Sequence, residues 1–224
     1  MRTRASLVIV ATCALLITGC GKGSADRAPS TSSTSTGTAS TAPAAGGNQL
    51  RDEQLKAALL TAQEMPSGFT VDTDEHTGAP NDAKGCATLS GIQPSPGTAH
   101  SAQIEFTKGQ TGTLVSESLL QQDEAQAKAT LNQFATAASG CPTFKSGIIS
   151  YTLSVLAFPK LGDDTLALHM AGTAAGVPVG IDLVEVRRGG VLMLVANAGV
   201  RTVDTALTES VARAALSKVD KTLG

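Results

Sequence analysis

The order of apolar and polar positions predicts a sheet of antiparallel strands between residue 69 and residue 198. Alternation of apolar and polar residues is typical of half-buried strands. Strand patterns occur at 69–74, 102–106, 114–119, 148–158, 165–171, 177–187 and 191–198. Arg188-Gly189-Gly190 separates the last two patterns and predicts a hairpin turn. Strands joined by short turns run antiparallel, so we expect an antiparallel sheet.

Other segments carry apolar residues three or four positions apart, which is the spacing of an amphipathic helix. These segments are 52–64, 124–139 and 202–223. Asp123 is placed to be the N-cap of the middle helix, and Gly140 to be its left-handed C-terminal cap. A further short helix is expected around 86–89. Helices at the start, middle and end of the domain must cover the sheet. The predicted fold class is therefore α+β, an antiparallel β-sheet with helices packed on its faces.

The N-terminus has the pattern of a lipoprotein leader. Arg2 and Arg4 precede an apolar run over 5–18, which is shorter than the roughly 20 residues that a bilayer span requires. The run ends in Leu16-Ile17-Thr18-Gly19-Cys20, where small side chains let a signal peptidase approach the backbone before the cysteine. We predict a lipoprotein signal peptide over 1–19 and lipidation of the Cys20 sulfur. The alternative is an ordinary secretory signal with a coincidental cysteine.

The residues from Cys20 onward predict a tether followed by one folded domain. Segment 20–48 is almost entirely Ser, Thr, Ala, Gly and Pro, so it lacks the apolar side chains that offset the entropy of folding. We expect a disordered linker here, with Ser and Thr residues that are candidates for glycosylation. Residues 49–224 suffice for one hydrophobic core. Acyl chains such as palmitate on Cys20 are expected to anchor the domain to the extracytoplasmic face of the cell membrane.

Composition argues against a nucleic-acid-binding protein. Charged residues make up 16% of the chain and aromatic residues 3%, and the net charge is −2. A nucleic-acid binder normally has a basic face and often stacking aromatic rings. We therefore predict no nucleic-acid partner. The Ala-rich, Lys-poor composition is typical of a high-GC actinobacterium.

Two cysteines, Cys86 and Cys141, remain in the predicted domain. An even number of cysteines in an exported domain indicates a disulfide, which here would close a loop of about 55 residues. The alternatives are a redox pair and a metal site. The redox pair lacks the C-x-x-C spacing, and a metal site would need His or carboxylate ligands at suitable spacing.

The three histidines do not form a ligand pattern. His76, His100 and His169 are scattered, and the ring of His169 is expected to face solvent or to cap the sheet. Asp72-x-Asp74-x-His76-x-Gly78 departs from a calcium loop, because its glycine is one position late and no Glu stands at position twelve. We predict no metal site and no cofactor.

Catalytic motifs are absent from the sequence. There is no G-x-S-x-G nucleophile elbow, no Walker A sequence and no G-x-G-x-x-G before a helix. Asp163-Asp164 is expected to be a solvated turn, and Arg187-Arg188 a charged hairpin end, with anion binding as the alternative for the arginines. We predict that the protein is not an enzyme and has no catalytic residues. A hydrolase would need a polar cluster around a histidine.

Several stretches of the domain resemble, in order, a group of actinobacterial lipoproteins. They are Leu59 to Phe69, Glu117, the Ala-rich helix ending at Cys141, Leu161-Gly162-Asp163-Asp164, Val186 to Val191, and the last helix with Lys218. These lipoproteins are similar to the PknH-type extracellular sensor domain of receptor Ser/Thr kinases, and the resemblance covers about 50–224. It implies an antiparallel sheet with helices on its faces and a groove proposed to bind a ligand.

The chain also departs from the kinase-linked sensors. It has one internal Cys pair, no Trp and no kinase domain, whereas those sensors usually carry two bridges. The resemblance therefore transfers no ligand-binding residue. It transfers only the Cys86–Cys141 bridge as an expected feature.

These patterns predict a lipid-anchored cell-envelope lipoprotein with a non-enzymatic, sensor-like ligand-binding domain. An apolar groove would suit a lipid or a cell-wall fragment. One alternative is an envelope lipid carrier, which predicts a sizeable apolar cavity. Another is a protein-interaction module of an envelope complex, which predicts an exposed apolar patch. The sequence assigns no ligand-binding residues and no oligomeric state.

Overall fold

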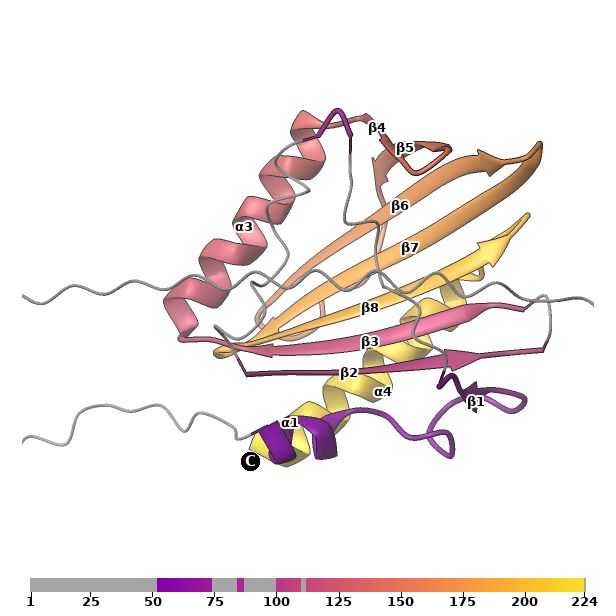
Figure 1. Ribbon diagram of the computed structural model, residues 1–224. Helices are drawn as coiled ribbons and strands as arrows, with labels where there is room; N and C mark the ends of the chain where they lie inside the picture. Colours follow the sequence, from indigo (N-terminus) through magenta and orange to yellow (C-terminus); the bar gives the residue numbers. More distant parts are fainter. Residues whose placement is uncertain (1–51, 74–83, 87–99, 110–111, 224) are drawn as a thin grey trace, which may run out of the picture. The chain divides into compact units, whose positions relative to one another are not determined.

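The computed structural model describes residues 52–73, 84–86, 100–109 and 112–223, which contain one eight-stranded sheet (Figure 1). The strand order is β1-β2-β3-β8-β7-β6-β5-β4, and every neighbouring pair is antiparallel. The strands are β1 (Thr70–Val71), β2 (His100–Thr107), β3 (Leu114–Gln121), β4 (Thr143–Ser146), β5 (Ile149–Val155), β6 (Asp164–Ala174), β7 (Val177–Arg188) and β8 (Val191–Val200). The predicted leader and linker, 1–19 and 20–48, lie outside the described residues.

Helices cover both faces of this sheet. On one face α1 (Asp52–Ala58) contacts β2, and α4 (Thr205–Leu223) contacts β7 and β8. On the opposite face α3 (Glu124–Gly140) packs over β5 to β8 (Figure 1). The predicted α+β class is thus confirmed. None of the helices in the described residues is long and apolar enough to cross a membrane.

Alternation along the strands separates the two faces. In β3, Val115, Glu117 and Leu119 are buried in the face under α1 and α4, whereas the residues between them are only partly buried. The largest fully buried apolar side chains of this face are Phe106, Leu55, Leu60, Leu119 and Met193. Burying one such side chain stabilises the fold by about 2 kcal/mol. This core therefore holds α1 and α4 on the sheet.

The face under α3 has a separate core around the disulfide. Cys86 and Cys141 are bonded, with Cα atoms 5.7 Å apart, and this confirms the predicted pairing. Phe144 of β4 stacks on Tyr151 of β5 with ring centroids 5.4 Å apart. Because Cys141 directly follows α3, the bridge fixes the end of this helix beside the aromatic pair.

The first helix is shorter than predicted. It ends at Ala58 rather than at Glu64. The Leu60 N–H donates to the Glu117 side chain at 2.7 Å instead of to a helical carbonyl. A separate turn follows, in which the Glu64 carboxylate accepts hydrogen bonds from the N–H and the hydroxyl of Thr61. The apolar spacing continues past Ala58, but the backbone has a tertiary partner there and leaves the helix.

The predicted cap at Gly140 is wrong. Gly140 is the last residue of α3 and is not left-handed, and the C-cap is Cys141 with φ −129°. Cys141 precedes Pro142, and a residue before proline disfavours the helical conformation. The proline therefore ends the helix without a left-handed glycine. The predicted N-cap is confirmed, since the Asp123 side chain accepts the Gln126 N–H.

Most strands occur where the alternation predicted them, and three segments differ. The pattern at 69–74 corresponds to the two-residue strand β1, and the pattern at 148–158 to the shorter strand β5. Strand β4 was not predicted, because Phe144 is the single buried residue among its four. The short helix expected at 86–89 lies outside the described residues, apart from Cys86.

Candidate functional site

A hollow on the surface of α4 is the candidate binding site. Its volume is about 450 Å³, and it is broadly open to solvent, so it is a shallow surface hollow rather than an enclosed pocket. Two leucines supply apolar surface, a serine supplies a hydroxyl group, and three further side chains carry charge. The lining residues are Leu161, Arg213, Leu216, Ser217, Asp220 and Lys221.

The spacing of residues along α4 brings these side chains together. Residues three, four and seven positions apart share one side of a helix. Arg213, Leu216 and Asp220 have this spacing and line the hollow. The stripe of Val211, Ala215 and Val219 is buried and holds α4 on the sheet. The hollow is therefore built on the side of α4 that the sheet leaves free.

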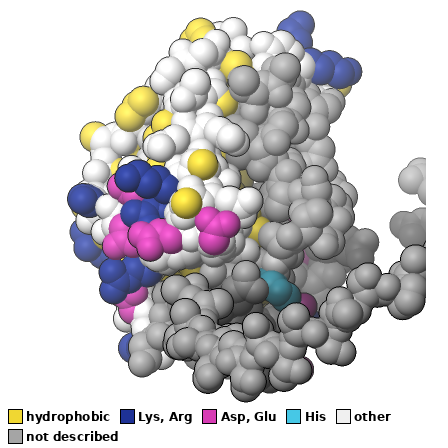
Figure 2. All heavy atoms as spheres, turned by 90° about the vertical axis from the view of Figure 1, so that its left-hand side faces the viewer, with side chains coloured by type: hydrophobic (Ala, Val, Ile, Leu, Met, Phe, Trp, Pro, Cys, Tyr) yellow, Lys and Arg dark blue, Asp and Glu magenta, His cyan; other side chains and the backbone are white. Residues whose placement is uncertain are grey.

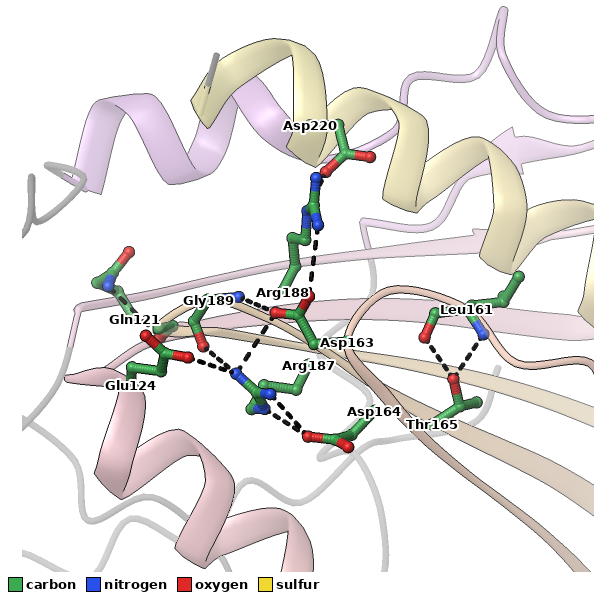
Figure 3. A network of polar contacts seen from close by, with 11 residues as sticks. Gln121, Glu124, Leu161, Asp163, Asp164, Thr165, Arg187, Arg188, Gly189 and Asp220 are labelled. Carbon is green, nitrogen blue, oxygen red and sulfur yellow. Dashed lines mark hydrogen bonds and ion pairs between the residues drawn. The ribbon is translucent and has the colours of Figure 1, made fainter.

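Leu161 reaches α4 from the loop before β6. Its N–H donates to the Thr165 hydroxyl oxygen at 2.7 Å, and the same hydroxyl donates to the Leu161 carbonyl (Figure 3). The next residue, Gly162, has a φ of +57°, and a Cβ atom there would lie 2.6 Å from the Arg187 carbonyl oxygen. Glycine is the residue that tolerates both conditions. The sequence of this loop thus fixes Leu161 as one wall of the hollow.

Arg188 joins the β7–β8 hairpin to α4 at Asp220, which lines the hollow. Its Nε donates to Asp220 Oδ1 at 2.7 Å, and its Nη1 lies 3.4 Å from Asp163 Oδ1 (Figure 3). Asp163 Oδ2 also accepts the Gly189 N–H at 2.7 Å. That hydrogen bond, together with Arg187 and Arg188, holds the pKa of Asp163 below its ordinary value. The expected solvated turn is instead bonded to the neighbouring hairpin.

Arg187 is surrounded by carboxylates of the chain itself. Its side chain is 8% exposed, and its guanidinium nitrogens lie 2.7 Å from Asp164, 3.3 Å from Glu124 and 3.4 Å from Asp163. Figure 2, which shows the left-hand side of Figure 1, has basic and acidic side chains gathered in one group. Anion binding by Arg187 is therefore disfavoured, because its donors are already engaged.

A second polar group lies between the segment after α1, the sheet and α4. Glu117 is fully buried; its Oε2 accepts the Leu60 N–H, and its Oε1 has no hydrogen-bond partner in the described structure. Lys218 Nζ lies 2.6 Å from Glu64 Oε2. Burial raises the pKa of Glu117 to about 7, while the Leu60 hydrogen bond and Lys218 oppose the rise. Glu64, Glu117 and Lys218 belong to the stretches that carried the resemblance, and the structure brings them together.

A third polar group is a buried network that the sequence analysis did not identify. Asp182 is fully buried, and its Oδ1 lies 2.6 Å from His169 Nδ1. Its Oδ2 accepts hydroxyl groups of Thr205 at 2.8 Å and Thr208 at 3.3 Å, both in the first turns of α4. Asn197 Nδ2 donates to the Thr208 hydroxyl at 2.9 Å. The sequence contains one indication of this network: Asp182 is a charged residue at an inward-facing position of the apolar strand 177–187.

The histidines do not form a shared site. The His169 side chain is 35% exposed, so its ring partly faces solvent as expected. It lies beside the Asp182 carboxylate, but the hollow on α4 does not include it. His100 pairs with Asp52 at 2.6 Å on the surface, and His76 lies outside the described residues, as does most of the loop compared with a calcium site. The described ranges contain no group of three or more His, Cys, Asp or Glu side chains that could hold a metal ion.

Comparison with known proteins identifies the fold. No protein-family model matches the chain, and no curated protein matches it. The extracellular domain of PknH from Mycobacterium tuberculosis is similar with a TM-score of 0.52 and 15% identity, over 79% of this chain and 98% of that chain. The chain has the fold of the PknH extracellular domain. The predicted resemblance is thus confirmed at the level of the fold.

A second solved structure is also similar. It is a protein from Mycobacterium smegmatis described as an Rv0999 ortholog, with a TM-score of 0.48 and 16% identity, over 74% of this chain and 96% of that chain. At 15% and 16% identity, the two similar structures do not assign roles to single side chains. They therefore say nothing about the hollow, the Glu117 group or the Asp182 network.

Proposed function

We propose that the protein is a lipid-anchored cell-envelope lipoprotein whose domain binds a ligand without enzymatic activity, as a sensor-like domain. The observation that carries this proposal is the fold shared with the PknH extracellular domain. A fold by itself does not define a function. The proposal therefore combines the fold with the leader pattern of the sequence and with the hollow on α4.

The leader and the disulfide support an extracytoplasmic location. The sequence before Cys20 has the order of a lipoprotein leader, and the Cys86–Cys141 bridge is of a kind that persists in oxidising compartments. Two or more acyl chains on Cys20 would anchor the protein to the membrane. The linker 20–48 would let the domain extend from the surface.

The hollow supports an amphiphilic ligand, either a lipid or a cell-wall fragment. Leu161 and Leu216 offer apolar contact, and Ser217 and Lys221 offer hydrogen-bond donors at the same place, whereas the Arg213 guanidinium is paired with Glu209 at 2.7 Å. An apolar surface with a few placed polar groups is typical of small-molecule sites. The ligand class that fits is an apolar group with an anionic or hydroxylated head.

The anchor is tested by metabolic labelling with a clickable palmitate analogue. We expect label on the full chain and on the Cys13→Ser variant, because Cys13 lies within the predicted leader. We expect no label on Cys20→Ser. Label that persists in Cys20→Ser, or an unlabelled wild-type chain, would contradict the anchor without bearing on ligand binding.

Binding is tested with a single tryptophan, since the chain has none. Ser217→Trp places the reporter in the hollow, and Ser154→Trp places a control on β5. The full chain in nanodiscs is titrated with dihexanoyl phosphatidylglycerol and with the corresponding phosphatidylcholine. We expect a saturable blue shift for Ser217→Trp alone, stronger with the anionic lipid. No shift, or equal shifts at both positions, would contradict binding in the hollow.

A further inference from the structure

We propose that Glu117 is a pH-sensitive latch, which holds the segment 59–69 against the sheet when its carboxyl group is protonated and loosens this segment when the group is ionised. The inference goes beyond the proposed function, because it concerns a conformational change on the face under α1 and α4. It rests on the burial of Glu117, on its Oε1 atom, which has no hydrogen-bond partner among the described residues, and on the charges around it.

Glu117 stands at a position where ionisation is unfavourable. It lies in the middle of β3 with Ile104 of β2 and Val195 of β8 as its cross-strand neighbours. Both neighbours are apolar, and Val195 is fully buried. Among the described residues, the Leu60 N–H, 2.7 Å from Oε2, is its hydrogen-bond partner, and Oε1 has none. A carboxylate in such a place loses the hydration that stabilises its charge.

The charged groups that face Glu117 do not offset this burial. From the turn after α1 comes Glu64, whose charge opposes ionisation of Glu117, and from α4 comes Lys218, whose charge favours it. The Lys218 ammonium group is paired with the Glu64 carboxylate at 2.6 Å, so its positive charge is partly neutralised before it acts on Glu117. The residues of α1 that face the core are Leu55 and Ala58, which carry no charge. The pKa of Glu117 at about 7 is consistent with this arrangement.

The segment that Glu117 holds carries much of the core on this face. Leu59, Leu60, Met65 and Phe69 are buried there. If the segment opens, water reaches Glu117 and the carboxylate regains hydration, while these side chains become exposed. Opening therefore becomes more favourable when Glu117 is ionised. The segment follows α1, which begins shortly after the predicted linker, so the latch acts on the part of the domain that joins the anchor.

The size of the effect follows from the two pKa values. The pKa of Glu117 is about 7 in the closed form and has its ordinary value of 4.5 in the open form. The equilibrium constant for opening therefore rises on the order of tenfold between pH 6 and pH 8. Below pH 6 the opening constant continues to fall toward its minimum, because both forms become protonated.

Hydrogen exchange measured by mass spectrometry tests the latch on the full chain in detergent. Protection of peptides covering Leu59–Met65, corrected for the intrinsic exchange rate, should fall on the order of tenfold from pH 6 to pH 8. Peptides of β8, which stay paired while the segment opens, should be more strongly protected than Leu59–Met65 at both pH values. Glu117→Gln should abolish the pH dependence at Leu59–Met65, whereas Glu185→Gln, a matched control under α3, should retain it.

Three results would overturn the latch. They are constant protection at Leu59–Met65 in the wild type, a pH dependence at Leu59–Met65 that persists in Glu117→Gln, and equal protection of the Leu59–Met65 and β8 peptides, which would indicate that both exchange through global unfolding. If Glu117→Gln does not fold, the wild-type comparison of Leu59–Met65 with β8 decides, because the latch requires Leu59–Met65 to open at a lower free energy than β8.

Discussion

Replacement of Glu185 by glutamine is expected to remove a defined part of the pH dependence of stability. Glu185 lies on β7 in the face under α3, with Leu166 and Leu194 as cross-strand neighbours. It is 7% exposed, and its Oε2 has no hydrogen-bond partner in the described structure. Arg187, two residues further on the same face, is engaged by Asp164 and other carboxylates. Burial raises the pKa of Glu185 to about 7.

This raised pKa determines the sign and the size of the effect. In the unfolded chain the carboxyl group titrates near its ordinary value of 4.5. Between 4.5 and about 7 the folded protein keeps a proton that the unfolded chain has lost, so the free energy of unfolding falls as pH rises through this window and is level above it. One pKa unit corresponds to about 1.4 kcal/mol, so the ionised Glu185 lowers the free energy of unfolding by about 3 kcal/mol at pH 8.

The glutamine side chain of the Glu185→Gln variant carries no charge, and urea unfolding at pH 5 and pH 8 measures the consequence. The difference in free energy of unfolding between Glu185→Gln and the wild type should be more favourable to the variant at pH 8 than at pH 5, by about 2.5 kcal/mol. The glutamine amide places the same unpaired donor in the core at both pH values, so its cost cancels when the results at pH 5 and pH 8 are compared. Glu53→Gln on the exposed side of α1 is the control. An equal difference from wild type at both pH values would refute the reasoning, since Glu185 would then ionise without a penalty.

Other changes test the disulfide, the loop at the hollow and the carboxylates around Arg187. The double variant Cys86→Ser and Cys141→Ser should lose about 4 kcal/mol in urea unfolding, and a loss near zero would contradict a constraint on the unfolded chain. Gly162→Ala should lower the thermal midpoint of unfolding more than Gly147→Ala. Both glycines have a positive φ, but a Cβ atom at Gly162 would meet backbone atoms, whereas a Cβ atom at Gly147 would have nothing within 4 Å. Equal midpoints would contradict the close approach. Arg187→Met should cost about 3 kcal/mol in urea unfolding at pH 7, because it leaves the surrounding carboxylates without their partner; a loss near zero would contradict the ion pairs.

The parts of the fold that the sequence predicts correctly are those in which buried residues recur at the regular spacing of a strand or a helix. Strands such as β3 bury every second residue, and α4 buries Val211, Ala215 and Val219 at helical spacing. The end of α1 was not predictable, because it depends on a hydrogen bond between Leu60 and Glu117, 57 residues apart. The pairing of β3 with β8 likewise joins distant segments that no local pattern connects.

The candidate site was less predictable than the fold. The cysteine pair could be named, because just two cysteines remain after the predicted leader and its lipidation site. The hollow could not, since Leu161 and α4 are far apart in the sequence and meet through the turn at Gly162. The resemblance marked Glu117 and Lys218 without showing that they lie in one group. Asp182 was missed because its partners Thr205 and Thr208 belong to another element.

The most direct test of the proposed function is native mass spectrometry of the full chain extracted from the membrane of its expression host in a mild detergent. We predict a retained amphiphile on the wild type that is lost in Leu216→Lys, which places a charge in the apolar part of the hollow. Val155→Lys, at an exposed apolar residue of β5, is the matched control and should keep the adduct. An adduct-free wild type, or an adduct that survives Leu216→Lys, would contradict ligand binding in the hollow and favour a protein-interaction role or another site.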